Sequence, residues 1–277
     1  MSAPPLKLLT LNLWNTAEPW PGRGRRIREW VERLDPDLMA FQEVVRLPGF
    51  DPLAELLEGH AYHTDYVSVS RFWRPGHEDV VGDVGNAVAS RWPIIDREEL
   101  PLPESGCGEK RAALSVTVAA PVGPISLTVT HLNWRLDHGW VRERQVQALC
   151  DFVMRRAPAK GFPPLLAGDF NAEPESTEIR YVTGLHTLEG RSVLFLDAWA
   201  RAGAAGPGIT WSNTNPWARR EREPDRRIDY LFAGLPPRDG RGQILECRVV
   251  CDDEVDGVWP SDHYGVYAEL RAEALEE

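Results

Sequence analysis

The sequence has no apolar run long enough to cross a membrane, few cysteines and no excess of positive charge. A membrane-spanning helix needs about 20 consecutive apolar residues, so the sequence offers no candidate for one. The four cysteines lack the paired spacing of zinc sites, which favours buried free thiols in a reducing compartment. Acidic residues outnumber basic ones by 42 to 31, for a net charge of −11. This balance disfavours broad affinity for nucleic acid, which depends on neutralising phosphates.

Signals of targeting and of modular organisation are also lacking. No apolar stretch with a small-residue cleavage site follows Met1, so we expect a cytoplasmic protein. The chain has no internal repeat, no low-complexity tract and no long linker. With 277 residues, 43% of them hydrophobic, it can bury a sizeable core without disulfides. We therefore expect a single domain over residues 1–277.

Strand and helix patterns alternate along the chain. Residues 6–13 and 38–41 have the apolar content of strands, and the apolar spacing over 25–34 is typical of an amphipathic helix. A tight connection at 121–124 predicts that its flanking strands pair antiparallel. Several connections are too short for crossovers, so we expect two packed sheets instead of one parallel sheet. Further strands are expected over 86–90, 93–100, 113–119, 125–130, 164–167, 227–232, 243–251 and 264–270, and further helices over 53–57, 140–156 and from 174.

Polar side chains recur where the expected strands end. In Gly168-Asp169-Phe170-Asn171 the glycine is expected to end a strand, which places an acid and an amide on one side of the loop. In open α/β sheets this edge is where ligands bind. An acid can hold a metal or orient water, and an amide can stabilise an oxyanion. Turns also favour Gly, Asp and Asn for backbone reasons, so this motif alone is weak. Other polar residues at expected strand ends are Asn12, Glu43, His131, Asp262 and His263.

Asp229 differs from these residues because apolar neighbours flank it within 227–232. An unpaired buried charge costs several kcal/mol, so this carboxylate needs a partner. His263 is the candidate. A carboxylate that accepts from one imidazole nitrogen fixes the tautomer and leaves the other nitrogen free to take a proton from water.

From Asn12 to His263 the chain resembles the endonuclease/exonuclease/phosphatase superfamily, the deoxyribonuclease-I-like metal-dependent phosphoesterases. Any one matching stretch is common, but all of them in this order are specific. The stretches are Thr10-Leu11-Asn12, Phe41-Gln42-Glu43-Val44, Gly85-Asn86-Ala87-Val88-Ala89-Ser90, Thr130-His131-Leu132, Gly168-Asp169-Phe170-Asn171, Arg227-Ile228-Asp229-Tyr230 and Ser261-Asp262-His263.

The resemblance implies an α/β (α+β) fold, a four-layer sandwich of two packed mixed β-sheets flanked by helices, with the site at one end. It implies a Mg²⁺ or Mn²⁺ ion with Glu43 as principal ligand. Asn12 is expected beside the metal and the phosphate, and Asp262 as a direct or water-mediated ligand. An oxygen-only set of ligands suits a hard cation.

The resemblance also implies the catalytic roles. His263, oriented by Asp229, is expected to be the general base for the attacking water, and Asp169 is expected to position that water or to share the base role. Asn171 and His131 are expected to stabilise charge on the phosphoryl oxygens. Attack would be in line at phosphorus, without a covalent enzyme intermediate.

Weaker signals surround these residues. Arg111 could reach a substrate phosphate or be a solvated charge, and Asn86 is expected to bind substrate. Residues 217–227 carry five arginines and three acids, which predicts a basic lip over the site or, as the better interpretation, a mobile charged loop. Several tryptophans near the motifs could line a rim or pack in the core. They are Trp14, Trp20, Trp73, Trp134, Trp211 and Trp217.

Two positions depart from the abasic-site nucleases of this superfamily, which usually carry Asp and Tyr where this chain has Trp14 and His131. Both departures, with the acidic net charge, weigh against DNA repair. The main hypothesis is a metal-dependent phosphoesterase that acts as a phosphodiesterase. The alternatives are a true endo- or exonuclease and a noncatalytic binding protein on the same fold. The sequence leaves nucleic acid, nucleotide, phospholipid and inositol phosphate open as substrates, and it leaves the oligomeric state open.

Overall fold

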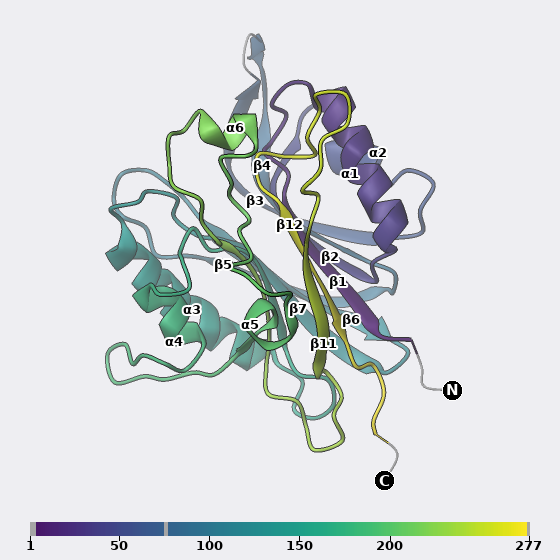
Figure 1. Cartoon of the computed structure of the whole chain (residues 1–277), viewed down its shortest axis with the longest axis vertical. Coiled ribbons are helices and arrows are strands. Elements are labelled where there is room, and N and C mark those ends of the chain that lie inside the picture. Colours follow the sequence, from purple (N-terminus) through teal and green to yellow (C-terminus); the bar gives the residue numbers. More distant parts are fainter. Residues whose placement is uncertain (1–3, 75–76, 276–277) are drawn as a thin grey trace.

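The computed structural model describes residues 4–74 and 77–275, with side chains described outside 73–80. Two six-stranded sheets pack face to face (Figure 1). The first sheet has the order β11-β12-β1-β2-β4-β3. Its strands are β1 (Leu6–Asn12), β2 (Leu38–Arg46), β3 (His63–Arg74), β4 (His77–Ser90), β11 (Ile244–Val250) and β12 (Gly265–Leu270).

The second sheet has the order β5-β6-β7-β8-β10-β9. Its strands are β5 (Ile94–Pro101), β6 (Ala112–Ala120), β7 (Gly123–His131), β8 (Leu165–Asp169), β9 (Leu196–Asp197) and β10 (Asp229–Ala233). As the tight connection predicts, β6 and β7 pair antiparallel. Each sheet contains one parallel pair, β1 with β2 and β7 with β8, among antiparallel neighbours. Both sheets are therefore mixed.

Helices cover the outer faces of the sandwich. In Figure 1, α1 and α2 lie over the first sheet on the right, and α3 and α4 lie over the second sheet on the left. The short helices α5 and α6 belong to the connections that lead from β9 to β10. The helices are α1 (Trp20–Leu34), α2 (Pro52–Leu56), α3 (Gly139–Arg156), α4 (Thr177–Val182), α5 (Ala198–Ala202) and α6 (Pro216–Arg219).

Three apolar layers hold these parts together. The central layer lies between the sheets, and side chains such as Leu8 and Val129 fill it. A second layer joins α1 to the outer face of the first sheet, and a third joins α3 to the outer face of the second. Because both faces of the inner strands are buried, these strands are almost continuously apolar. The four-layer sandwich expected from the resemblance is confirmed.

Several boundaries differ from the sequence prediction. Helix α1 begins at Trp20, although the Pro and Gly residues that follow predicted a loop, because Trp20 and Arg23 are buried. Strand β3 was not predicted; it is an edge strand with a largely polar, partly exposed pattern. Helix α4 begins at Thr177, later than predicted, because the Ser176 side chain caps it by accepting from the Ile179 N–H.

The sequence predicted that Gly168 ends its strand. This prediction is wrong, because Gly168 lies within β8, which continues to Asp169. Its φ is +146°, and a Cβ built there would lie 2.0 Å from the Thr130 carbonyl oxygen of β7. The glycine therefore permits the close approach of two parallel strands whose last residues both belong to the predicted site.

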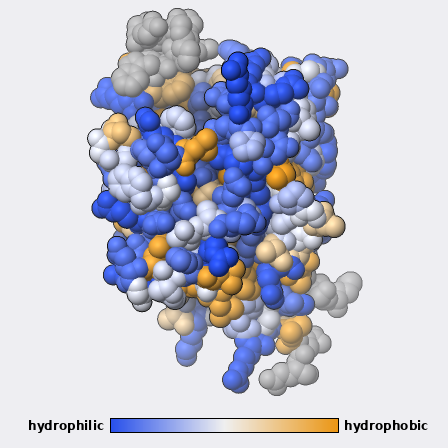
Figure 2. All heavy atoms as spheres, turned by 60° about the vertical axis from the view of Figure 1, so that its left-hand side comes forward, coloured by the Kyte–Doolittle hydropathy of each residue, from blue (hydrophilic) through white to orange (hydrophobic). Residues whose placement is uncertain are grey.

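Within the described ranges, no helix is long and apolar enough to cross a membrane. Cys150, Cys247 and Cys251 are buried free thiols as predicted, whereas Cys107 is exposed. Hydrophilic side chains dominate the face drawn in Figure 2, with apolar residues in small groups.

Candidate active site

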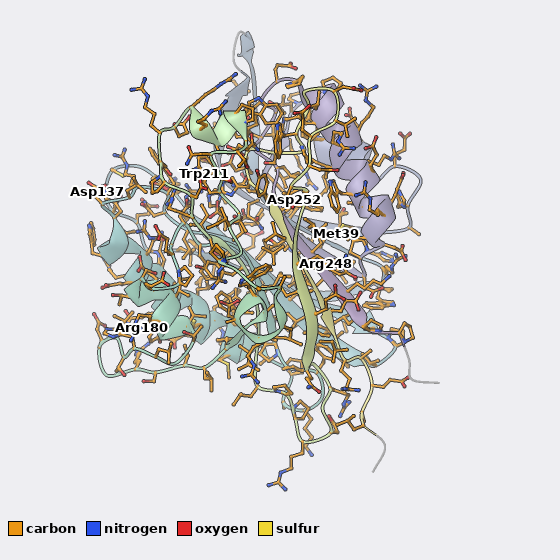
Figure 3. The ribbon with its side chains drawn as sticks, in the orientation of Figure 1. Met39, Asp137, Arg180, Trp211, Arg248 and Asp252 are labelled. Atoms are coloured by element: carbon orange, nitrogen blue, oxygen red, sulfur yellow. The ribbon has the colours of Figure 1, made fainter. Side chains whose placement is uncertain are left out.

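A cleft of about 380 Å³ opens beside Trp211 and Glu221, on the segment that carries α6. Figure 1 shows α6 at one end of the sandwich. Trp211, labelled in Figure 3, lies in the wall of the cleft. Both sheets contribute to the cleft, since the strand ends of the two parallel pairs meet there. Its lining residues are Trp14, Asn15, Glu43, Arg111, His131, Trp134, Asp169, Asn171, Trp211, Glu221, Glu223, Arg226, Ile228, Asp262 and His263.

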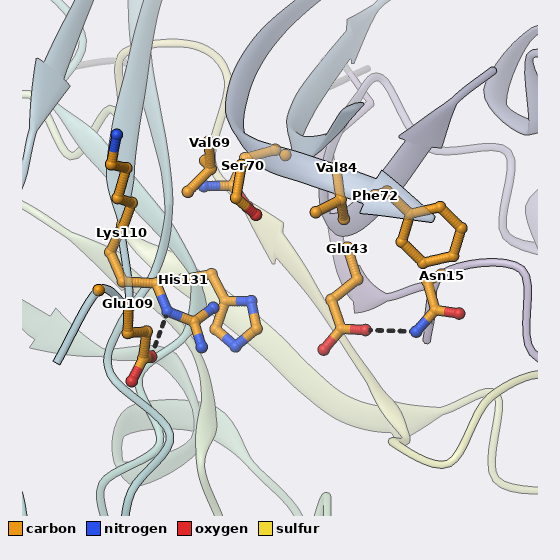
Figure 4. A pocket seen from close by; sticks show the side chains of 13 residues that line it. Asn15, Glu43, Val69, Ser70, Phe72, Val84, Glu109, Lys110 and His131 are labelled. Atoms are coloured by element: carbon orange, nitrogen blue, oxygen red, sulfur yellow. Dashed lines mark hydrogen bonds and ion pairs between the residues drawn. The ribbon is translucent and has the colours of Figure 1, made fainter. Parts of the chain in front are cut away.

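Glu43 reaches the cleft from a β-bulge. The sequence placed it at the end of a strand, but β2 continues to Arg46, and its register against β4 shifts between Phe41 and Val44. Glu43 adopts a φ of 53° within this shift. An extra residue in a strand re-aims a side chain, and here the carboxylate faces two amides. Asn15 Nδ2 donates to Glu43 Oε2 at 3.1 Å. A dashed line marks this hydrogen bond in Figure 4.

Asn12 connects Glu43 to the second sheet. Its Nδ2 lies 3.4 Å from Glu43 Oε1 and donates to Asp169 Oδ2 at 3.1 Å. Its side-chain oxygen accepts from the Trp14 N–H at 2.9 Å, which fixes the orientation of the amide. One buried amide thus holds carboxylates from both sheets close together.

Strand register brings the other acids and histidines together. Asp169 is the register partner of His131 on β7 and of Asp229 on β10. His131 Nε2 lies 3.3 Å from Asp169 Oδ2, and His263 Nε2 lies 3.7 Å from the same oxygen. His263 Nδ1 lies 3.0 Å from Asp229 Oδ2. This is the pairing that the buried acid predicted.

The His263 imidazole is held in place from several sides. The edge of the Trp211 ring packs against it, with centroids 4.8 Å apart. Ser261 Oγ accepts from the His263 N–H at 3.3 Å and donates to the Asn12 carbonyl at 2.7 Å. The backbone N–H of Asp229 donates to Thr210 Oγ1 at 3.2 Å. The histidine–aspartate pair is therefore a rigid part of the cleft wall.

Burial and charge separate the pKa values of the two histidines. Burial opposes the charging of His263, but the carboxylates of Asp229 and Asp169 outweigh it and raise its pKa to about 10. Burial, together with Arg111 and His263, lowers the pKa of His131 well below its ordinary value. At neutral pH His263 is an imidazolium and His131 is a neutral imidazole.

Two acids have raised pKa values. Burial, reinforced by the Asp229 carboxylate, raises the pKa of Asp169. Burial, reinforced by Glu43, raises the pKa of Asp262 to about 7. Both shifts arise mainly from burial, which penalises the charged form of these carboxyl groups.

The carboxylates on this side of the cleft fit a hard divalent cation. Glu43 and Asp262 offer carboxylate oxygens, the ligands that Mg²⁺ and Mn²⁺ prefer, while the amide nitrogens of Asn12 and Asn15 face Glu43. One potential ligand atom each from Asp169, Asp229 and His263 also lies within 4.8 Å of the other two. An imidazolium has no lone pair for a metal, so this second group fits proton transfer better.

The remaining predicted residues surround this centre. Asn171 has a φ of 50°, its N–H donates to Asp169 Oδ1 at 2.9 Å, and its Nδ2 donates to the Leu132 carbonyl at 3.2 Å. Arg111 lines the cleft and pairs with Glu109 at 2.8 Å; with its side chain only 14% exposed, it is not a solvated charge. Asn86 is buried and donates to the Ala112 carbonyl at 2.9 Å, across the two sheets.

A second hollow of about 260 Å³ adjoins the cleft (Figure 4). Val69, Phe72 and Val84 from β3 and β4 give it an apolar wall. Four residues, Asn15, Glu43, Arg111 and His131, line both hollows. A molecule bound at Glu43 can therefore extend from the polar cleft into an apolar space.

The arginine-rich segment 217–227 does not form a uniformly basic lip: residues 219–222 are exposed, whereas Arg226 and Arg227 are buried. Glu221 and Glu223 line the cleft beside Arg226, and Arg226 pairs with Glu223. Arg227 is buried and donates to Asp197 at 2.8 Å. Of the tryptophans, Trp14, Trp134 and Trp211 line the cleft, Trp20 and Trp217 are buried, and the Trp73 side chain lies outside the described residues.

Two residues at the site were not predicted. Asn15 was not predicted because the family pattern has its polar residue at position 14, where this chain has Trp14. Arg23 is fully buried, and its side chain donates to five backbone carbonyls. Four of them belong to residues 13–17, the loop that carries Asn15, and the fifth is that of Pro260. Burial lowers the pKa of Arg23 to about 10, against the pull of Asp262 and Glu43. Its position within a loop-like sequence gave no signal of this role.

Solved structures with the same fold cover nearly the whole chain. The human Nocturnin catalytic domain with bound sulfate anion gives a TM-score of 0.71 at 20% identity, covering 97% of this chain and 94% of that one. TDP2 from D. rerio complexed with single strand DNA product gives 0.71 at 17% identity, covering 95% and 98%. At these identities the likeness concerns the fold alone.

Two curated proteins match parts of the sequence. "Carbon catabolite repressor protein 4 homolog 3" from Arabidopsis thaliana is 29% identical over 161 residues, 57% of this chain and 34% of that protein. "Inositol phosphosphingolipids phospholipase C" from Schizosaccharomyces pombe is 27% identical over 214 residues, 71% of this chain and 46% of that protein. The matches span less than half the length of either relative. The profile of the Endonuclease/Exonuclease/phosphatase family matches residues 9–263, and the chain belongs to this family.

Proposed function

We propose that this protein is a divalent-metal-dependent phosphodiesterase that hydrolyses its substrate by in-line attack of water. The observation that carries the proposal is the double contact of Asn12, whose amide lies 3.4 Å from Glu43 and 3.1 Å from Asp169. Through it, a carboxylate suited to a metal and a carboxylate suited to proton transfer face one cleft. Since both sheets supply this one site, we also propose that residues 1–277 form one domain.

Glu43 is the proposed principal ligand of Mg²⁺ or Mn²⁺, with Asp262 and Asn12 beside it. When bound, the cation supplies Lewis acidity to a phosphoryl oxygen and stabilises the leaving oxygen. Asn15 and Asn12 donate to the two oxygens of Glu43 and so keep the carboxylate directed into the cleft. In metal sites, hydrogen bonds of this kind to a ligating carboxylate fix its orientation toward the ion.

Asp169 is the proposed general base. His263 is protonated at neutral pH because Asp229 and Asp169 raise its pKa to about 10, so it has no free nitrogen for a proton from water. Asp169 is ionised at neutral pH and its raised pKa makes it a stronger base than an ordinary carboxylate. Its Oδ1 accepts from the Asn171 N–H, and Oδ2 faces the cleft beside both histidines.

His263 then serves as a fixed positive charge instead of a base. Held by Asp229, it stabilises the negative charge that develops on the phosphoryl oxygens, where preorganised donors are most effective. His131 adds a neutral donor, and Asn171 and Arg111 are proposed to bind further phosphoryl oxygens. Asn86 is proposed to contact substrate from the apolar hollow that it lines.

A diester fits the two connected hollows better than a monoester. The phosphorus would lie between Glu43 and Asp169, with one ester group in the cleft and the other against Val69 and Phe72. The phospholipase C relative and the TDP2 structure with a DNA product also support a diester. A nuclease remains the second candidate, favoured by the DNA product in that neighbour and disfavoured by Glu221 and Glu223 at the cleft.

The free thiols support a reducing, cytoplasmic setting as part of the same proposal.

Hydrolysis of bis(p-nitrophenyl) phosphate and p-nitrophenyl phosphate, with Mg²⁺, Mn²⁺ or EDTA, tests the proposal. We expect metal-dependent cleavage of the diester in preference to the monoester, and its loss in Glu43→Gln. Glu246→Gln on β11 is the matched control, since that partly exposed acid pairs only with Arg248 among the described residues. Full activity in EDTA, or in Glu43→Gln, would contradict the proposal.

A further inference from the structure

A second group of metal-binding side chains lies beside the cleft and plays no part in the proposed reaction. Cys107 Sγ, a carboxylate oxygen of Glu109 and a ring nitrogen of His138 all lie within 4.8 Å of one another. Cys107 and Glu109 belong to the connection from β5 to β6, and His138 to the connection from β7 to α3. In Figure 3 the neighbouring Asp137 lies at the outer edge, where α3 begins.

Neighbouring donors already orient the ligand atoms of this group. Glu109 accepts from Arg111 Nε at 2.8 Å and from Asn133 Nδ2 at 2.6 Å. Cys107 Sγ lies 2.7 Å from Ser105 Oγ. In functional metal sites, outer hydrogen bonds of this kind fix the positions of the ligands. Asn133 is itself buried, so the Glu109 carboxylate is held from inside the fold.

His138 supplies an observation that a surface ion pair would not explain. Its Nδ1 is shielded from solvent and has no hydrogen-bond partner among the residues that the structure describes. A shielded polar atom without a partner is costly unless a ligand or an ion satisfies it. Glu109 alone could be a counter-ion for Arg111, but that role leaves the thiol and the imidazole unexplained.

The donor set differs in kind from that of the cleft. Thiolate and imidazole are ligands for zinc and other borderline or soft cations, whereas the Glu43 region offers only oxygen. The hydrogen bond from Ser105 lowers the pKa of the Cys107 thiol, which favours the thiolate that a metal requires. The two regions should therefore select different ions.

We propose that Cys107, Glu109 and His138 form a binding site for Zn²⁺, with water in the fourth position. The ion would join two connections that are separate in the sequence and that both border the cleft. Glu109 also pairs with Arg111, which lines the cleft. Arg111 would therefore connect the carboxylate that binds the ion to the space where substrate binds. This inference does not depend on the proposed reaction.

Titration of the full chain with Co²⁺, in a thiol-free reductant, tests the site directly. Cobalt bound to a thiolate has a near-ultraviolet charge-transfer band that cobalt bound only by oxygen and nitrogen lacks. Cys107 is the exposed cysteine of the chain, so we expect one equivalent to give the band, Zn²⁺ to abolish it and Cys107→Ser to lose it. His138→Ala should weaken Co²⁺ binding at least about tenfold.

Matched variants separate this site from the cleft. Glu43→Gln should keep the band even where it abolishes hydrolysis, and His186→Ala should keep it because His186 is an exposed histidine outside the group. Zn²⁺ should also raise the melting temperature of the wild type but not that of Cys107→Ser, which reports binding to the folded state. A missing band in the folded wild type, or a band unchanged in Cys107→Ser, would overturn the proposal.

Discussion

The two sides of the cleft are built on different principles. On the Glu43 side, a partly exposed carboxylate lies on a β-bulge and contacts the neutral amides of Asn12 and Asn15. On the Asp169 side, buried acids and histidines lie in regular strand register and contact one another as charges. Among the described residues, the Glu43 carboxylate forms no ion pair within 4 Å, and the first side is suited to a cation. The second carries its own cation, His263, and is suited to moving a proton.

This difference leads to different responses to mutation. A defect on the Glu43 side should be a defect of metal affinity, which a higher metal concentration can offset. A defect on the Asp169 side should persist at any metal concentration, because it removes a group that acts on the water or on the phosphoryl oxygens.

The largest effect is expected for Asp169→Asn. Replacing a general base by an amide of the same shape removes the proton acceptor, and kcat should fall by roughly 10²- to 10⁴-fold. Steady-state kinetics on the diester, across a series of Mg²⁺ concentrations, would measure it. No concentration should restore the rate; recovery at high Mg²⁺ would move Asp169 to the metal-binding side.

Glu43→Gln is the matched change on the other side of the cleft. Loss of the principal ligand should weaken Mn²⁺ binding by at least about 10- to 100-fold, judged from the effect of altering residues around metal ligands. Calorimetric titration with Mn²⁺ would measure the affinity, and kinetics would show partial recovery at high metal. Unchanged Mn²⁺ affinity would contradict the assignment of Glu43.

The pH dependence distinguishes the two charged groups of the Asp169 side. Activity should rise as Asp169, whose pKa is raised to about 6, loses its proton, and fall as His263, with a pKa of about 10, loses its own. In His263→Gln the alkaline fall should disappear, and kcat should be about 10²-fold lower because the fixed charge is gone. The profile of kcat/KM against pH checks this. An alkaline fall that persists in the variant would show that another group causes it.

Asp262→Asn should change stability in a direction that depends on pH. Burial raises the Asp262 pKa from 3.8 to about 7, so the folded protein binds this proton more tightly than the unfolded chain. The acid therefore favours folding below its unfolded pKa, and this advantage is lost as the pH rises through about 7. Without metal, the variant should be more stable than wild type near pH 8 by about 2 to 4 kcal/mol. Urea unfolding in EDTA near pH 5 and near pH 8 would measure the difference, which should be less than half as large at the lower pH.

The smallest effect is expected in the adjoining hollow. Phe72→Ala removes part of the apolar wall and should raise KM for the aryl diester by about tenfold, with little change in kcat. The monoester, which lacks the second ester group, should be affected less. Equal changes for both substrates would place the second ester group elsewhere.

The sequence predicts the regular parts of this site and misses the irregular ones. Asp229 stood out because an acid in an apolar strand needs a partner, and its partner is His263 as predicted. The apolar runs also place Asn12 and His131 at or just after strand ends, where β1 and β7 do end.

What the sequence could not supply depends on contacts between distant segments. The bulge at Glu43 is visible only in the register of β2 against β4. Arg23 stabilises the loop over residues 13–17 by donating to backbone carbonyls. Any residue type has such a carbonyl, so the sequence gives no sign of these contacts. The group at Cys107 and His138 comes from two connections separated by a pair of strands, so no spacing rule for zinc sites detects it.

The protonation state of His263 tests the contrast between the two sides most directly. Nuclear magnetic resonance of the ¹⁵N-labelled imidazole ring, in the metal-free protein, reports whether one or both ring nitrogens carry a proton. We predict that both are protonated throughout neutral pH, because Asp229 and Asp169 raise the pKa to about 10. A ring that is neutral at pH 7, with a free Nε2, would contradict this prediction and would return the role of general base from Asp169 to His263.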